Sequence, residues 1–186
     1  MAGFFDLPAD LPVPSDDGAA RHLPGRTMPS LSLPSIGGGE VDLTALGPGT
    51  TILYIYPLSG RPGVELPEGW DNIPGAPGCT PEACGFRNHL REIQAAGAER
   101  LFGLSSQSTE YQAEFAHRLG LPFALLSDPR LELAEALSLP TFTVEQQRLY
   151  KRMTLVLRGS EIEHAFYPVF PPDEHATEVL RWMRDR

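Results

Sequence analysis

The sequence has few cysteines, few basic residues and no long apolar run, and each shortage excludes a class of protein. Its 186 residues include two cysteines, which excludes a scaffold held together by disulfides. The 15 lysines and arginines are outnumbered by 24 aspartates and glutamates, and the net charge of −9 repels nucleic-acid phosphates and anionic lipid. No apolar run approaches the ~20 residues of a membrane-spanning helix, and the first residues do not resemble a secretory signal. We therefore expect a cytoplasmic protein that binds neither nucleic acid nor membrane.

Length and composition indicate one globular domain over residues 1–186. Hydrophobic residues make up 41% of the chain, enough for a single core. The 18 glycines and 19 prolines predict long irregular segments beside the regular ones. Residues 1–49 are rich in Pro, Gly, Asp and Ser, and we expect them to form an N-terminal arm that ends in a small hairpin of strands 31–33 and 41–43.

Strand and helix patterns alternate after this arm. Residues 51–56 form a β-branched and aromatic run, typical of a strand that is buried on both faces of a sheet. The later patterns are, in chain order, a helix over 81–96, a strand over 101–104, a helix from Ser108 to Gly120, a strand over 123–126, a helix opened by Asp128 and Pro129, a hairpin of strands 153–157 and 161–167, and a helix over about 173–184. This order predicts an α/β, thioredoxin-like fold whose mixed central sheet has helices on both faces.

Residues 58–78 form a long loop between the first buried strand and the helix that follows it. The segment consists mainly of Gly, Pro and turn-forming residues. Loops of this length inside a compact domain are usually functional, and in open α/β sheets the reactive site lies beyond the carboxyl ends of the strands. We therefore expect this loop, which carries Trp70, to form a rim over a reactive site.

Cys79 lies at the start of the helix after the loop. Thr80, Pro81 and Glu82 supply an N-cap, a proline at the first helical position and an acid in the first turn. The free N–H groups at a helix N-terminus stabilise a thiolate, so we expect Cys79 to sit at a surface turn with a lowered pKa. The alternative is that Cys79 is a small buried hydrophobic residue.

Cys84 follows Cys79 at a spacing that favours a redox cycle. In an intact helix the two side chains point ~140° apart and their Cα atoms are more than ~7 Å apart, so a disulfide requires unwinding. The first turn of a helix unwinds most easily, which suits a dithiol that closes when the turn opens. Two thiolates do not complete a zinc shell, and the five histidines show no ligand spacing, so we expect no metal.

The segment 77–87 carries a family resemblance. Its sequence, PGCTPEACGFR, resembles the PGCT-x-E-A-C-x-F-R element of the Q-type, bacterioferritin-comigratory-protein-like peroxiredoxins, and the similarity extends over most of the chain. The resemblance implies a thioredoxin-fold thiol peroxidase without a cofactor. It makes Cys79 the peroxidatic cysteine, Cys84 the resolving cysteine of the same helix, Glu82 the acid that follows, and Arg152 the arginine that opens the next-to-last strand.

The chain departs from the family pattern just before the peroxidatic cysteine. The family places a proline seven residues and a threonine three residues before it, where this sequence has Asn72 and Ala76. We interpret Pro57 as the equivalent proline, displaced by an insertion of about fifteen residues within loop 58–78. Ser59 is then our candidate for the missing hydroxyl, which must accept a hydrogen bond from the substrate and donate one to the thiolate.

The resemblance also implies a reaction cycle and its partners. A hydroperoxide oxidises Cys79 to a sulfenic acid, Cys84 condenses with it to a disulfide, and thioredoxin or a similar dithiol restores both thiols. We expect a monomer or weak dimer. Two other functions remain open, namely a thiol-disulfide oxidoreductase that acts on proteins and a non-enzymatic redox switch.

Overall fold

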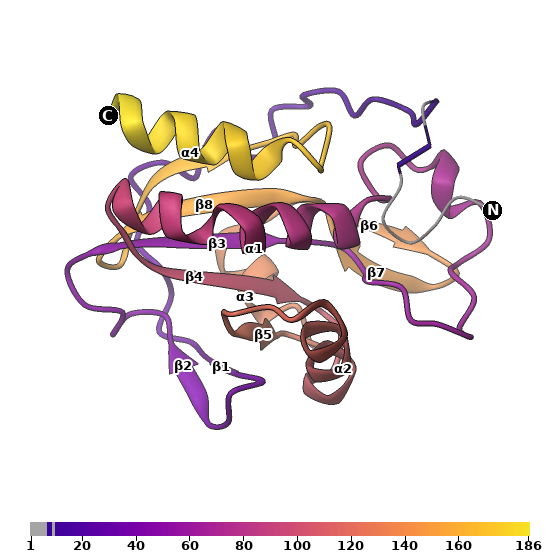
Figure 1. Ribbon diagram of the computed structural model, residues 1–186, viewed down its shortest axis with the longest axis horizontal. Helices are drawn as coiled ribbons and strands as arrows, with labels where there is room; N and C mark the ends of the chain where they lie inside the picture. The colour runs from indigo at the N-terminus through magenta and orange to yellow at the C-terminus, as the bar shows by residue number, and fades with distance from the viewer. Residues whose placement is uncertain (1–6, 9) are drawn as a thin grey trace.

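A mixed five-stranded sheet forms the centre of the protein. The computed structural model describes residues 7–8 and 10–186 (Figure 1). The strands, in their order across the sheet, are β5 (Leu125–Ser127), β4 (Ala98–Ser105), β3 (Thr50–Ile55), β8 (Met153–Arg158) and β9 (Glu161–Phe166). Strands β3, β4 and β5 are parallel, whereas β8 is antiparallel to both β3 and β9. The predicted α/β, thioredoxin-like fold is confirmed.

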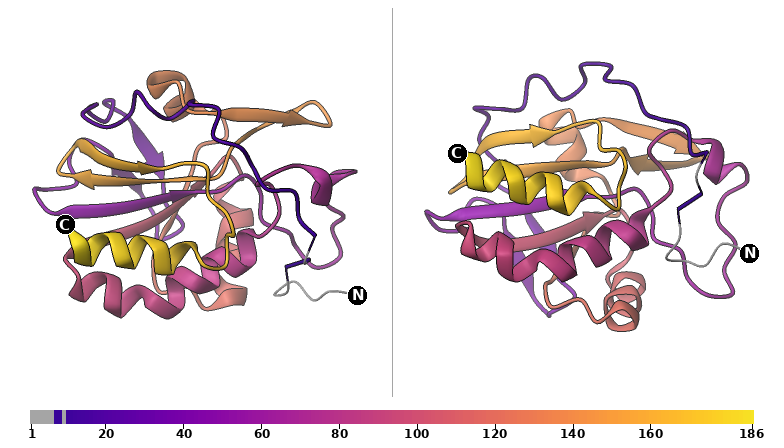
Figure 2. Two further views of the ribbon diagram at one scale, coloured as in Figure 1. Left: turned by 90° about the horizontal axis from the view of Figure 1, so that it is seen from above. Right: turned by 45° about the horizontal axis from the view of Figure 1, so that its top comes forward.

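Helices cover both faces of this sheet. The helices are α1 (Cys79–Ala95), α2 (Thr109–Leu119), α3 (Glu132–Leu137) and α4 (His175–Asp185). Side chains of α1, α2 and α4 share one hydrophobic core, and those of α3 share the other with the N-terminal arm. Helices α1 and α4 lie side by side, as both views in Figure 2 show. Helix α1 therefore packs against both the sheet and α4.

Strand β3 runs through the middle of both cores. All six of its residues are buried, as its apolar sequence predicts for a central strand. Leu53 belongs to the core on the α3 side, whereas Tyr54 belongs to the core on the α1 side and stacks on Phe86 at 4.6 Å between ring centroids. The strand thus directs Tyr56 and Pro57 toward the beginning of α1.

The N-terminal hairpin is present where the sequence predicts it. Strand β1 (Ser32–Pro34) pairs with the antiparallel strand β2 (Glu40–Asp42). The arm before this hairpin runs to the end of the molecule where loop 58–78 carries the 3-10 helix η1 (Trp70–Asn72), as Figures 1 and 2 both show. Segments far apart in the sequence therefore meet at this end.

One hairpin is missing from our sequence prediction. Strand β6 (Thr141–Val144) pairs with β7 (Gln147–Tyr150) in a separate two-stranded sheet. Its turn residues, Glu145 and Gln146, have φ values of 47° and 66°. This left-handed turn is normally marked by Asn or Gly, and neither residue is present to signal it.

Helices α3 and α4 begin a few residues after their predicted starts. Helix α3 begins at Glu132 rather than directly after Asp128 and Pro129. The Asp128 carboxylate still caps it, because it accepts hydrogen bonds from the backbone N–H groups of Glu132 and Leu133, both at 2.9 Å. Helix α4 begins at His175, two residues later than expected.

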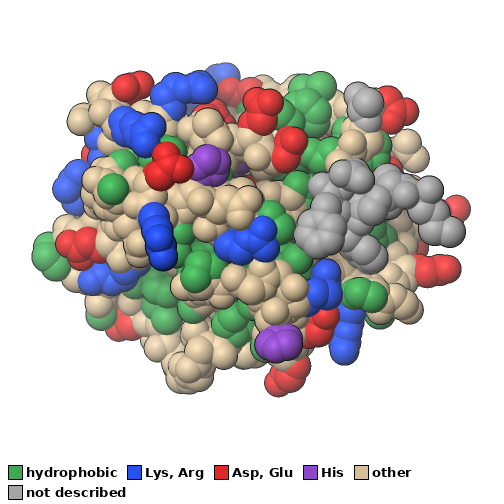
Figure 3. Space-filling view, in the orientation of Figure 1, with side chains coloured by type: hydrophobic (Ala, Val, Ile, Leu, Met, Phe, Trp, Pro, Cys, Tyr) green, Lys and Arg blue, Asp and Glu red, His purple; other side chains and the backbone are tan. Residues whose placement is uncertain are grey.

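The surface shows no sign of a large single-charge field on the face in Figure 3. Basic and acidic side chains are interspersed there over the helices and the loops. Among residues 7–8 and 10–186, no helix is both long and apolar enough to cross a membrane.

Candidate active site

Cys79 is the first residue of α1, and this position corrects two of our predictions. The N-cap is Gly78, with φ at 101°, rather than Thr80. A side chain at residue 78 would collide with Pro172, so glycine meets both the left-handed backbone and the close packing. Cys79 is 4% exposed, so it lies in a buried site and not at a surface turn.

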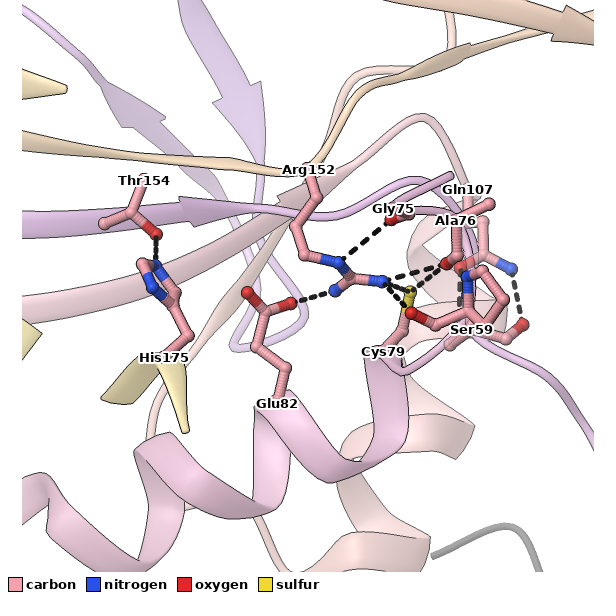
Figure 4. A network of polar contacts seen from close by, with 10 residues as sticks. Ser59, Gly75, Ala76, Cys79, Glu82, Gln107, Arg152, Thr154 and His175 are labelled. Atoms are coloured by element: carbon pink, nitrogen blue, oxygen red, sulfur yellow. Dashed lines mark hydrogen bonds and ion pairs between the residues drawn. The ribbon is translucent and has the colours of Figure 1, made fainter. Parts of the chain in front are cut away.

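Arg152, the residue before β8, binds this thiol and the loop that precedes it. Its Nη2 lies 3.1 Å from Cys79 Sγ (Figure 4). The same nitrogen donates to the carbonyl oxygens of Ala76 at 2.9 Å and Pro77 at 3.0 Å, and Nε donates to the carbonyl of Gly75 at 3.2 Å. With 3% of its surface exposed, the guanidinium is fixed in the core by the loop that precedes Cys79.

Glu82 binds the Arg152 guanidinium on the side away from the loop carbonyls. It lies on α1 one turn after Cys79, is fully buried, and makes an ion pair with Arg152 Nη1. Its second oxygen, Oε1, has no hydrogen-bond partner among the described residues. One arginine therefore faces two acidic groups, a carboxyl and a thiol.

The electrostatics of the pair differ from our sequence prediction. Burial raises the pKa of the Cys79 thiol, the Arg152 guanidinium opposes this rise, and the Glu82 carboxylate adds to it. The predicted lowering of this pKa is wrong because it assumed a solvated helix end. Burial also raises the pKa of Glu82, again against Arg152. The two acids compete for one positive charge and titrate as a coupled pair.

The segment after β3 completes the thiol's surroundings. The backbone N–H of Leu58 donates to the Cys79 sulfur, and Pro57 before it is buried. Ser59 is fully buried, and its hydroxyl donates to Gln107 Oε1 at 2.9 Å. Gln107 Nε2 donates back to the Ser59 carbonyl at 3.1 Å. The assignment of Ser59 as the substitute hydroxyl stays a prediction.

Gln107, which holds Ser59, is a residue that our sequence interpretation missed. It follows the carboxyl end of β4, next to the carboxyl end of β3, where α/β proteins concentrate their functional groups. Its own backbone N–H donates to Ser105 Oγ at 3.1 Å. Its position after a predicted strand was therefore the available signal.

Cys84 lies in the second turn of α1 and is half-buried. Both cysteines are free thiols in a continuous helix. Because a helix directs residues five apart to different sides, the first turn has to open before the two sulfur atoms can bond.

The neighbouring histidine is a packing residue. His175 is 1% exposed, and its Nε2 lies 2.8 Å from Thr154 Oγ1 (Figure 4). Its ring packs edge-on against Phe86. Among the residues that the structure describes, no cluster of His, Cys, Asp and Glu side chains could hold a metal ion.

Comparisons with known proteins agree with this geometry. The Redoxin family model matches residues 23–180, so the chain belongs to the redoxin family. Peroxiredoxin Q of Sedum lineare, a chloroplastic protein, is 28% identical over 98% of this chain and 89% of its own. The crystal structure of peroxidoxin BcpB from Mycobacterium tuberculosis superposes with a TM-score of 0.70 at 26% identity and covers 88% of this chain and 98% of its own.

A third similar protein is the bacterioferritin comigratory protein of Xanthomonas campestris, whose structure is described in connection with alkyl peroxide reduction. It has a TM-score of 0.67 and 26% identity, and covers 88% of this chain and 96% of its own. The resemblance to Q-type peroxiredoxins, a class of thiol peroxidases, is confirmed.

Proposed function

We propose that Cys79 is the peroxidatic cysteine of a thiol peroxidase that reduces hydrogen peroxide or organic hydroperoxides. The observation that carries this assignment is the contact of 3.1 Å between the buried sulfur and the guanidinium of Arg152. The thiolate attacks one peroxide oxygen, an S–O bond forms, and the O–O bond breaks. The other oxygen leaves as an alkoxide or hydroxide and takes up a proton, which gives an alcohol or water and a Cys79 sulfenic acid.

Arg152 serves both the nucleophile and the leaving oxygen. A guanidinium in a buried site stabilises a thiolate and a developing oxyanion without reorganising, because the carbonyls of residues 75–77 and the Glu82 carboxylate already orient it. The Leu58 N–H supports the thiolate from another side, and the buried Pro57 precedes it. Ser59 is the candidate hydroxyl, and its O–H has to turn from Gln107 toward the thiolate to act.

Cys84 is the resolving cysteine in this proposal. Its thiol condenses with the sulfenic acid, and the products are a Cys79–Cys84 disulfide and water. For this step Cys79 has to leave Arg152, and the first backbone bond of the helix, from the Glu82 N–H to the Gly78 carbonyl at 3.1 Å, has to open. An external dithiol, which we take to be thioredoxin or a close equivalent, then reduces the disulfide by exchange and is itself oxidised.

Location and assembly are part of the same proposal. We expect this cycle to run in the cytoplasm, although the Sedum relative is chloroplastic. We expect the protein to work as a monomer or weak dimer, since both cysteines lie on one helix and no second chain is needed to form the disulfide.

The deciding experiment is the second-order rate of thiol oxidation by hydrogen peroxide, followed by intact mass. The wild type should react orders of magnitude faster than a free thiol and lose two hydrogen atoms, and Cys79→Ser should remove the fast reaction. A wild-type rate equal to that of a free thiol would favour the alternatives. Fast reduction of a protein disulfide would then indicate an exchanger, and slow oxidation without turnover would indicate a redox switch.

A further inference from the structure

A cavity of about 230 Å³ lies beside the catalytic arginine. It forms at the end of the molecule where the N-terminal arm, the loop with η1 and the β6–β7 hairpin meet (Figures 1 and 2). The volume is just below the ~300–1,000 Å³ of ordinary small-molecule sites, so the cavity suits a compact ligand.

The walls of this cavity are mainly apolar. Pro14 comes from the arm, Ile73 and Pro74 from the inserted loop, Phe142 from β6, and Val169 from the segment before α4. Desolvation of apolar groups favours binding of a carbon substituent here.

Arg152 connects the cavity with the reacting sulfur. It is a lining residue of the cavity, and the same guanidinium contacts Cys79 Sγ at 3.1 Å. Gly75 also lines the cavity, and its carbonyl accepts the hydrogen bond from Arg152 Nε. The cavity thus adjoins the residue that contacts the reacting sulfur, while Cys79 itself is not part of the lining.

Asp17 holds the N-terminal arm in place as one side of the cavity. Its Oδ2 lies 2.8 Å from Lys151 Nζ, and its Oδ1 accepts a hydrogen bond from the Tyr167 hydroxyl at 2.9 Å. All three residues line the cavity. The Lys151 contact and the other hydrogen bonds hold the pKa of Asp17 at about 2, so the Asp17 carboxylate is ionised at neutral pH.

The arm residues of the cavity lie outside the redoxin match. The redoxin match begins at residue 23, whereas the arm residues of the cavity, Pro14 to Asp17, precede it. The cavity is thus built in part from residues that precede the matched range.

We propose that the N-terminal arm closes a subsite for the alkyl or aryl substituent of an organic hydroperoxide, which makes the arm a determinant of substrate specificity. This inference rests on the proposed peroxidase function. The substituent occupies the cavity, the peroxide group lies at Arg152, and the product alcohol leaves from the same space. Hydrogen peroxide has no substituent and gains nothing from the subsite.

The test compares two substrates in variants of the arm. Ser15 lines the cavity, so Ser15→Trp should fill it. The matched control is Val13→Trp, since Val13 is 67% exposed and lies outside the lining. The measured quantity is the ratio of kcat/KM with cumene hydroperoxide to kcat/KM with hydrogen peroxide. We expect this ratio to fall at least tenfold in Ser15→Trp and to keep its wild-type value in Val13→Trp.

A binding measurement separates this inference from the peroxidase function. Cumyl alcohol, the product of cumene hydroperoxide, is titrated into Cys79→Ser and followed by calorimetry, and the titration is repeated with Ser15→Trp added. We expect saturable binding in the first protein and its loss in the second. If the wild type reduces neither peroxide, the proposed function fails and this titration still decides on the subsite.

Two results would overturn the subsite. One is an unchanged substrate ratio in Ser15→Trp. The other is cumyl alcohol binding that is absent from Cys79→Ser or that Ser15→Trp does not weaken, because the arm would then not border the occupied space.

Discussion

Arg152 Nη2 lies 3.1 Å from Cys79 Sγ, although 73 residues separate them in the chain. The contact forms because β8 runs antiparallel to β3, so the start of β8 meets the end of β3 beneath the first turn of α1. The sheet thus positions the Arg152 guanidinium near the thiol, and the carbonyls of residues 75–77 orient it.

Arg152→Lys should lose most of the peroxidase rate. A lysine keeps the charge but offers one ammonium in place of a planar fork, and it cannot contact Cys79, Glu82 and the loop carbonyls together. We expect the second-order rate with hydrogen peroxide to fall on the order of 100- to 1,000-fold in stopped-flow measurements. Circular dichroism should show retained secondary structure. A variant with an unchanged rate would remove Arg152 from the mechanism.

Glu82→Gln should lower the pKa of Cys79. The Glu82 carboxylate raises that pKa and competes for Arg152, so its replacement by a neutral amide leaves the guanidinium to the thiolate. Because the thiolate is the reactive form, the wild-type rate should rise with pH through the Cys79 pKa. The midpoint of this profile should move to lower pH in Glu82→Gln. A midpoint that stays in place, or moves up, would show that the two acids are not coupled.

Cys84→Ser should keep the first reaction and lose the cycle. Peroxide should still oxidise Cys79 at the wild-type rate, and intact mass should show the gain of one oxygen atom in place of the loss of two hydrogens. Turnover with thioredoxin and its reductase should fall to background. Sustained turnover in this variant would show that another thiol resolves the sulfenic acid.

Trp70 should report the departure of the Cys79 sulfur from Arg152 and from the Ala76 carbonyl. It is buried in a small core with Ala76 and Leu149, and the carbonyl of Ala76 binds Arg152. Oxidation of the wild type should therefore change its tryptophan fluorescence. Trp182 is the other tryptophan and packs against His164 at 4.8 Å between rings. The change should disappear in Trp70→Phe, and a change that persists there would originate from Trp182.

Ser59→Ala should slow the reaction with peroxide, by about tenfold or more, if its hydroxyl replaces the family threonine. Thr80→Ala is the matched control, because Thr80 also carries a buried hydroxyl and directly follows Cys79. We expect the control to retain the wild-type rate in the same stopped-flow assay. Equal rates for Ser59→Ala and the wild type would leave the site without a substitute hydroxyl.

Periodicity and local chemistry were sufficient to predict most of the fold. The apolar run at β3, the capping serine before α2 and the glycine after it all lie where the sequence places them. The β6–β7 hairpin was missed because Glu145 and Gln146 adopt a left-handed turn without the residues that usually mark one. Local patterns predict helices and strands well when residues adopt the backbone conformations they prefer. At Glu145 and Gln146 the tertiary packing overrides those preferences.

The site was predictable in its members but not in its environment. The spacing and the family resemblance singled out Cys79, Cys84 and Arg152, and the structure brings Cys79 and Arg152 together. Burial of the thiol could not be inferred, because it depends on how Gly78 packs against Pro172. The sign of the pKa shift follows from that burial and was wrong for the same reason.

The hydrogen bonds from Arg152 to the carbonyls of residues 75–77 all lie on the N-terminal side of Cys79. The first turn of α1 unwinds toward Cys84, on the C-terminal side of Cys79. The hydrogen bonds between Arg152 and residues 75–77 therefore stay in place while Cys79 is bonded to Cys84. Once the disulfide is reduced, one turn of helix has to re-form next to Arg152 and residues 75–77, which are already in position. The return to the reduced, active state is then a local coil-to-helix transition, and the loop does not have to change its conformation.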